Sequence, residues 1–194
     1  MSQNLQLITP AEKWPDDNIK SLAVTNPQQA MASVIKKYRE PLLYHALCIV
    51  KDEDEAYDLV QEVFIRAIRE SRLFTHDFRI KAWLYRVTTN LCFNNVRNRK
   101  RRAAILEAKM VTELKESDQI RNIFEGQRQQ EILRSISKLT EDHQKILLLR
   151  YYDDLSYAEI ADVLNIKLGT VMSRLSRART RLLAVIDQGL CQTS

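Results

Sequence analysis

The stretch with the clearest chemistry is a run of basic and hydroxyl side chains at residues 174–181. Apolar residues recur there at every third or fourth position, which predicts one buried stripe along a helix: Val171, Leu175, Ala178, Leu182 and Val185. The other face carries arginines and serines with no acidic residue between them: Ser173, Arg174, Ser176, Arg177, Arg179 and Arg181. Guanidinium and hydroxyl groups backed by an apolar stripe suit a helix that faces a polyanion such as DNA.

A second helical segment directly upstream would position this basic helix. Ser156 and Glu159 have the spacing of a capping box at its start, and its apolar residues follow the helical period: Tyr157, Ile160, Ala161 and Leu164. Residues 165–167 break the pattern, and the basic helix opens at residues 168–170. Short helix, short turn and basic helix is the helix-turn-helix plan, whose second helix enters the major groove. An ordinary antiparallel helix pair with a solvated basic face is the alternative.

Composition favours an all-α protein with one large domain or two small ones. The chain has 194 residues with only 3 Gly and 4 Pro, too few for long loops or an all-β fold. The net charge is +5, but the charges are segregated: acids gather at residues 52–62 and bases at residues 97–102 and 174–181. This segregation predicts two kinds of partner surface.

Several classes of site are not indicated. The 3 cysteines and 3 histidines have neither zinc-ligand spacing nor a disulfide framework, so reduced thiols and no metal are expected. Glycine-rich phosphate loops and nucleophile–base pairs are not evident either, which disfavours a helical phosphotransferase or nuclease and predicts no cofactor. The first 18 residues lack an apolar signal core, so we expect a cytoplasmic protein without membrane insertion.

The N-terminal part reads as a loose arm followed by a long helix. Residues 1–18, which include Trp14, are expected to be disordered. Asn26 as cap and Pro27 at the first position mark the start of a helix. Pro41 is expected to kink or divide that helix near Tyr38. Its apolar face comprises Ala30, Val34, Ile35, Tyr38, Leu42, Leu43, Ala46 and Ile49.

An acidic helix is predicted to begin at residues 52–55, where the helix dipole favours acids. Its apolar stripe is regular: Ala56, Leu59, Val60, Val63, Phe64, Ala67 and Ile68. The residues off that stripe are mostly acidic: Glu53, Asp54, Asp58, Gln61 and Glu62. They form either a solvated face or a docking face for a basic partner helix.

A third helix is predicted after an interruption at residues 73–77, with Asp77 as its cap and the apolar residues Ile80, Trp83, Leu84, Val87 and Leu91. Aromatic residues lie beside arginines and asparagines in this stretch: Phe74, Phe78, Trp83 and Tyr85. The helix ends in the basic residues 97–102. This mixture is typical of surfaces that stack on unpaired bases and follow a phosphate backbone, although Phe74 and Trp83 would equally serve a core.

The remaining chain divides into a linker and a C-terminal domain. We expect a flexible linker at residues 103–127, between domains at residues 19–102 and 128–188. The helical pattern resumes through Ile132, Leu133, Ile136 and Leu139. Thr140 is predicted to cap a helix whose apolar residues are Ile146, Leu147, Leu149 and Tyr151. Residues 189–194 are expected to fray.

Three runs together resemble the extracytoplasmic-function (ECF) group of bacterial sigma factors. They are residues 54–64 (DEAYDLVQEVF), residues 82–87 (AWLYRV) with Asn90 and the following basic cluster, and residues 155–161 (LSYAEIA) with 169–171 (GTV) and 173–179 (SRLSRAR). In order and spacing they cover about residues 31–183. The resemblance implies two helical domains, the second and fourth sigma regions, joined by a flexible link.

The resemblance also implies partners and roles. The acidic helix resembles the surface that binds the clamp helices of core RNA polymerase, with Asp54, Asp58, Leu59, Gln61 and Glu62 as its contacts. The third helix and its preceding loop resemble the part that opens the minus-ten promoter element, through Phe74, His76, Asp77, Trp83, Arg86, Asn90, Asn94, Arg97, Arg99, Lys100 and Arg101. The last helix resembles the reader of the minus-thirty-five element, through Thr170, Met172, Ser173, Arg174, Ser176, Arg177, Arg179 and Arg181. The polymerase flap and an anti-sigma factor are further partners implied by the family.

Two positions depart from the family pattern. Met172 stands where members usually carry Arg or Lys, and apolar contact with a thymine methyl group is one substitute. Residues 75–77 lack the glycine often found in that loop. The alternative function is a free-standing helix-turn-helix regulator, which would leave the acidic helix and residues 83–102 without a role.

Overall fold

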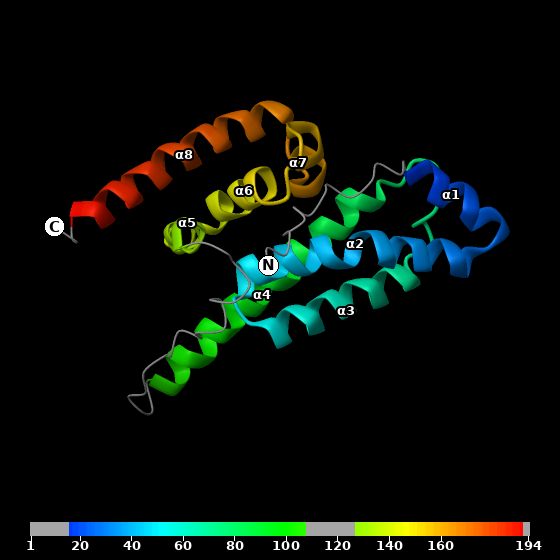
Figure 1. Cartoon of the computed structure of the whole chain (residues 1–194), viewed down its shortest axis with the longest axis horizontal. Helices are drawn as coiled ribbons and strands as arrows, with labels where there is room; N and C mark the ends of the chain where they lie inside the picture. Colours follow the sequence, from blue (N-terminus) through cyan, green and yellow to red (C-terminus); the bar gives the residue numbers. More distant parts are fainter. Residues whose placement is uncertain (1–15, 108–126, 192–194) are drawn as a thin grey trace, which may run out of the picture.

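The structure is a computed structural model that describes residues 16–107 and 127–191, with side chains for residues 16–105 and 129–188. Eight helices and no strand are formed within these ranges (Figure 1), which confirms the predicted all-α class. Their bounds are α1 Asp16–Thr25, α2 Pro27–Val50, α3 Glu53–Arg69, α4 Ile80–Glu107, α5 Gln127–Ser137, α6 Glu141–Tyr151, α7 Tyr157–Leu164 and α8 Leu168–Cys191.

In the N-terminal half, α1, α3 and α4 all pack against α2. The predicted start signals are confirmed. The Asn26 side chain accepts a hydrogen bond from the N–H of Gln29 at 3.0 Å, and Asp52 accepts one from Glu55 at 2.9 Å. These bonds satisfy N–H groups that a helix leaves free in its first turn. The starts of α2 and α3 are thereby defined locally, and the position of α3 follows from its buried stripe against α2 and α4.

Several expectations for this half are wrong. Pro41 does not divide α2, which continues to Val50: proline removes one N–H, while Tyr38 and Leu42 near it are both buried and hold the segment in place. The predicted arm is helical from Asp16 onward, where the carboxylate accepts hydrogen bonds from Lys37 and Tyr38. Trp14 lies outside the described residues.

The start and faces of the helices also differ from expectation. Asp77 is fully exposed and contacts His76, so it does not cap α4; the N–H of Trp83 bonds instead to the carbonyl of Arg79. Ile68, assigned to the buried stripe of α3, is 62% exposed. The helix α4 also runs five residues beyond the basic cluster, to Glu107, into the segment expected to be linker.

The C-terminal half is built from α5–α8. Ser156 and Glu159 form the predicted capping box, and Asn165 ends α7 in the left-handed conformation (φ 53°), so the turn before α8 is set locally. Thr140 lies at the cap position of α6, but its side chain makes no capping bond. Ile132 and Tyr151, which belong to the apolar patterns of α5 and α6, are exposed, whereas Leu148 is buried. The expected fray at residue 189 is wrong for the backbone, since α8 extends to Cys191.

The two halves are in contact. Helix α7 packs against α4, and Figure 1 shows α6 and α7 between α8 and the first four helices. The buried apolar residues of both halves form one contiguous cluster. No described helix is both long enough and apolar enough to span a membrane.

Candidate nucleic-acid interface

The basic helix α8 separates its two faces as its sequence predicts. Val171, Leu175 and Ala178 are buried against the C-terminal core. Ser173, Ser176, Arg177, Arg179 and Arg181 are exposed on the other side, and Met172 beside them is 55% exposed. The apolar stripe therefore holds the helix while the basic face remains accessible.

Two arginines of this face differ in environment. Arg174 is half-buried and pairs with Asp142 of α6 at 3.3 Å, so an acid does reach this face from another helix. Arg177 is exposed, and its Nε donates to the carbonyl of Ser173 one turn earlier at 3.3 Å. Because this hydrogen bond is exposed to solvent, Arg177 can give it up for an acceptor on a partner at little cost in free energy. Arg177 is thus better placed than Arg174 for contact with a base edge. Thr170 is half-buried at the start of α8.

The acidic helix α3 presents an exposed ridge at steps of three and four residues. Asp54, Asp58 and Gln61 begin this ridge, and Ile65 and Ile68 continue it with 42% and 62% exposure. The ridge is therefore acidic at one end and apolar at the other, a pattern typical of a surface that docks a partner. The sequence analysis missed the apolar end, because Ile68 fits the buried period nearly as well as the exposed one.

The other two predicted contacts on α3 are less exposed. Glu62 is half-buried and accepts a hydrogen bond from Arg66 at 2.8 Å. Leu59 packs against the core cluster from its edge. Glu62 therefore borders the ridge, while Leu59 supports it from beneath.

A second ridge runs along α4 and contains much of the predicted minus-ten surface. Its residues recur at steps of three and four: Trp83, Arg86, Asn90, Asn94, Arg97 and Arg101. Asn90, Asn94, Arg97 and Arg101 are exposed, as is Lys100 beside them. Trp83 is half-buried and lies 6.0 Å from Phe78 between ring centroids, and Phe74 packs against the core edge. Tyr85 is buried, so it does not take part in base stacking.

Several predicted contacts of α4 have intramolecular partners that the sequence did not reveal. Arg99 donates to Glu55 at 3.2 Å and to the carbonyl of Val50 at 3.1 Å, which ties α4 to α2 and α3. Arg97 donates to Asn94 and pairs with Glu141 of α6 at 3.6 Å. Arg99 therefore also has a structural role, while Lys100, Arg101 and Arg102 beside it are exposed.

The loop before α4 is supported by a helix that the sequence analysis did not predict. His76 and Asp77 are almost fully exposed at its tip. Lys20 of α1 donates to the backbone carbonyl of His76 at 2.7 Å. Helix α1 thereby positions the backbone of the loop while the side chains of His76 and Asp77 stay open to solvent.

A buried polar line crosses the boundary between the halves. His45 of α2 contacts Asp153, from the loop after α6, at 2.6 Å and Thr89 of α4 at 2.9 Å. Threonine, histidine and aspartate in this order resemble a nucleophile–base–acid line. However, His45 is fully buried and the side chain of Asp153 is only 2% exposed, so no substrate can approach it. Thr89 and Asp153 come from different halves of the chain, so His45 contacts both of them only while the halves are in contact.

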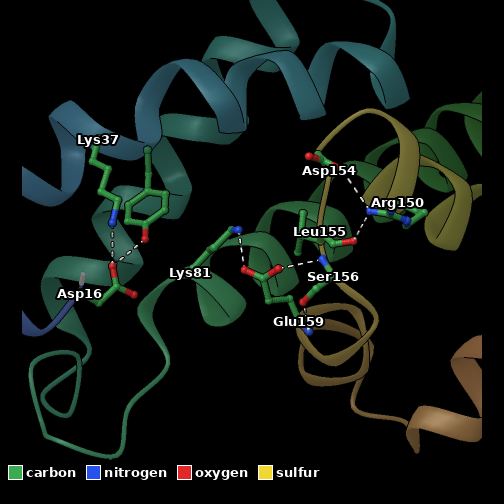
Figure 2. A network of polar contacts seen from close by, with 9 residues as sticks. Asp16, Lys37, Lys81, Arg150, Asp154, Leu155, Ser156 and Glu159 are labelled. Atoms are coloured by element: carbon green, nitrogen blue, oxygen red, sulfur yellow. Dashed lines mark hydrogen bonds and ion pairs between the residues drawn. The ribbon is translucent and has the colours of Figure 1, made fainter. Parts of the chain in front are cut away.

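A second polar contact across this boundary involves Glu159. Burial acts to raise the pKa of this carboxyl group, but the Lys81 ammonium and the hydrogen bonds from Ser156 outweigh it and hold the pKa below its usual range. Lys81 reaches Glu159 at 2.6 Å (Figure 2). Glu159, a member of the capping box of α7, thus also presents a negative charge to α4.

The thiols of Cys48 and Cys92 are not poised for chemistry. Burial raises the pKa of Cys92 to about 12 and that of Cys48 well above its usual value. Both cysteines are free. Within the described residues, no cluster of His, Cys, Asp and Glu has the arrangement of a metal site.

Both halves match known sigma-factor families. Residues 34–102 match the family described as Sigma-70 region 2, and residues 129–182 match Sigma-70, region 4. The chain is 30% identical over 190 residues to the ECF RNA polymerase sigma-E factor of Escherichia coli K12, which covers 92% of this chain and 93% of that protein. The chain belongs to the ECF group of sigma factors. The region 2 match takes in the acidic helix and the α4 ridge, which a free-standing regulator would leave without a role.

Other proteins similar to this ECF sigma factor agree with the assignment. The RNA polymerase sigma-H factor of Pseudomonas aeruginosa is 32% identical over 162 residues, which are 78% of this chain and 83% of that protein. Two solved structures share the fold. CnrH in complex with the cytosolic domain of CnrY has a TM-score of 0.64 at 24% identity, covering 89% of this chain and 97% of that one. RpoE in complex with the anti-sigma factor NepR from Bartonella quintana has a TM-score of 0.60 at 22% identity, covering 84% and 98%.

Proposed function

We propose that this ECF sigma factor is a dissociable promoter-specificity subunit of RNA polymerase. It binds the core enzyme in the cytoplasm, directs it to particular promoters and promotes DNA melting, without a catalytic centre or cofactor of its own. The observation that carries this proposal is the presence, in one chain, of both sigma regions with an exposed acidic ridge on α3 and an exposed basic face on α8.

In this proposal each surface has its own partner. The α3 ridge, with Asp54, Asp58 and Gln61, binds the clamp helices of the largest polymerase subunit, and the C-terminal half also contacts the flap. The α4 ridge and the loop at His76 bind the melted minus-ten element. The α8 face binds the minus-thirty-five element, with Arg177 and the serines toward bases and Arg179 and Arg181 toward phosphates. An anti-sigma factor is a further partner, by analogy with the RpoE–NepR complex.

In vitro transcription tests the proposal. Purified core polymerase and this chain are incubated with a library of promoter fragments, and run-off transcripts are sequenced. We expect specific start sites only when both proteins are present. If the chain binds promoter DNA but does not co-purify with core polymerase or support initiation, the free-standing regulator becomes the better explanation.

The first prediction concerns polymerase docking. Asp58→Lys/Glu62→Lys should weaken core binding roughly tenfold or more, because like charges at an interface cost several kcal/mol. The fold should persist, since Asp58 is exposed and the Glu62–Arg66 pair is a surface pair of about 0–1 kcal/mol. The measurement is a pull-down titration, with Glu40→Lys on exposed α2 surface as the control. Equal affinity for wild type and the double variant would leave the acidic face merely solvated.

The second prediction separates base reading from phosphate contact on α8. If Arg177 makes a paired contact to a guanine edge, Arg177→Ala should cost about 1–3 kcal/mol and relax preference at one base pair. Arg181 lies one turn further along, so Arg181→Ala should weaken all sequences alike and lower the log–log salt slope by about 0.9. Binding to a panel of single-base promoter variants distinguishes the two. Uniform losses for both variants would move base reading to Ser173, Ser176 or Met172.

A further inference from the structure

Two exposed apolar side chains lie at the start of the basic helix α8. Leu168 and Met172 are 50% and 55% exposed, whereas Val171 and Leu175 in the same two turns are 0% and 1% exposed. The core of the C-terminal half therefore uses the second pair and leaves the first pair open to solvent. Because Leu168 and Met172 are four residues apart on one helix, their side chains are neighbours on its surface. They form a small apolar patch, which we call the apolar pair.

The apolar pair belongs to the face of α8 that is assigned to DNA. Leu168, Met172 and Ser176 follow one another at steps of four residues and form one row along the helix. The adjacent row begins at Ser173 and continues with Arg177, and both of these residues are exposed. One row of this face is thus apolar at its N-terminal end, while the neighbouring row is polar and basic. The N-terminal residues of the second helix are the ones that contact base edges in a helix-turn-helix.

Gly169 indicates that a partner approaches this end of α8 closely. It lies next to Leu168 in the sequence and has a helical backbone. A Cβ atom at this position would meet nothing within 4 Å, and alanine is favoured over glycine inside a helix. Neither packing among the described residues nor the backbone conformation therefore requires glycine here. Glycine is typical of places where a backbone lies against a ligand, because a side chain would hold the two apart.

The major groove of DNA offers one apolar group to such a patch. The edges of the four base pairs display hydrogen-bond donors and acceptors there, and the C5-methyl group of thymine is the apolar group among them. An apolar side chain pressed against a donor or an acceptor would leave that group without water or a partner, which costs free energy. Contact with a methyl group instead removes apolar surface from water on both sides. The apolar pair therefore favours thymine at the base pair that it covers.

We propose that the apolar pair of Leu168 and Met172 reads the C5-methyl group of a thymine in the minus-thirty-five element. The inference rests on the proposed function, because it needs α8 to lie in the major groove of the promoter. Ser173 and Arg177 in the adjacent row then contact the hydrogen-bonding edges of neighbouring base pairs. The side chain of methionine is unbranched and flexible, so Met172 can adapt to the position of the methyl group.

Removal of the methyl group from the DNA tests the proposal. Promoters are first selected from a random-sequence duplex library with the full chain and core polymerase. Each thymine of the selected minus-thirty-five element, on either strand, is then replaced in turn by deoxyuridine, which lacks only the methyl group. At least one replacement should weaken holoenzyme binding roughly 4-fold, the factor that corresponds to burial of one methyl group. Replacement of thymines outside the promoter elements should have no effect.

A double variant assigns this effect to the apolar pair. Leu168→Ala/Met172→Ala shortens two exposed side chains, so the fold should persist. This variant should bind the thymine promoter roughly 4-fold more weakly than wild type and should no longer distinguish thymine from deoxyuridine. Leu183→Ala is the matched control, because Leu183 is an exposed apolar residue about three turns further along the same helix. The control should retain the full distinction between the two bases.

The outcomes separate the inference from the proposed function. If no replacement by deoxyuridine in the minus-thirty-five element changes holoenzyme binding, the inference is rejected while the proposed function stands. The inference is also rejected if Leu168→Ala/Met172→Ala responds to deoxyuridine as wild type does, because other residues then read the methyl group. If the chain and core polymerase together select no promoter from the library, the proposed function fails and the inference fails with it.

Discussion

Leu175→Asp should unfold the C-terminal half of this ECF sigma factor. Leu175 is 1% exposed on the buried face of α8, between Val171 and Ala178, which are also buried. Truncation of a buried leucine alone costs about 2–5 kcal/mol, and an unpaired carboxylate in the same place adds several more. The sum is comparable with the whole stability of a small domain, about 5–15 kcal/mol.

Thermal unfolding followed by circular dichroism, together with hydrogen exchange by segment, would measure this effect. Leu183→Asp is the matched control, because Leu183 lies on the same helix but is 62% exposed. We expect loss of protection in α6–α8 for Leu175→Asp and near-wild-type behaviour for Leu183→Asp. The same melting temperature for both variants would mean that the face of α8 has been assigned wrongly. Any loss of DNA binding by Leu175→Asp reports on folding and not on base contact.

His45→Ala should produce the second large effect, since it leaves a buried carboxylate without its partner. The side chains of His45 and Asp153 are 0% and 2% exposed and lie 2.6 Å apart. Removal of one member of a buried pair typically costs about 3–5 kcal/mol. Separation of the two halves would let water reach Asp153. The cost is therefore limited to the free energy of opening, and we expect opening before global unfolding.

A double variant can test this explanation. His45→Leu/Asp153→Leu removes both polar groups and should be much closer to wild type in the free energy of unfolding than His45→Ala, because no charge is left unpaired. Urea unfolding measures the free energy of unfolding of each variant. A double variant as unstable as His45→Ala would show that packing volume, and not the unpaired carboxylate, determines the cost.

Much of the fold was predictable because its signals are local. The period of apolar residues marks the helices, and the caps at Asn26, Asp52 and Ser156 act within three residues of themselves. The split between the buried and basic faces of α8 follows from one helix alone. The resemblance to sigma factors likewise depended on short ordered runs, and the matches to both sigma regions confirm it.

The misassigned positions lie where two periods or two partners compete. Ile68 and Tyr151 fit a buried stripe by spacing but are exposed, because none of the described helices covers that side of α3 or α6 at those points. The helix α2 is not divided at Pro41, because burial of the residues near it outweighs one missing hydrogen bond. Tertiary packing overrides local preference in each case.

The sequence by itself determined most of the helices after α1, most of their polar and apolar faces, the helix-turn-helix and the family. Only the tertiary structure decided which of the exposed-looking charges are committed to partners within the chain. Arg86 bonds to residues 76 and 77 positions away, and His45 to one 108 positions away. No periodicity spans such separations, because these pairs form only when the cores of both halves have brought α4 and α7 together.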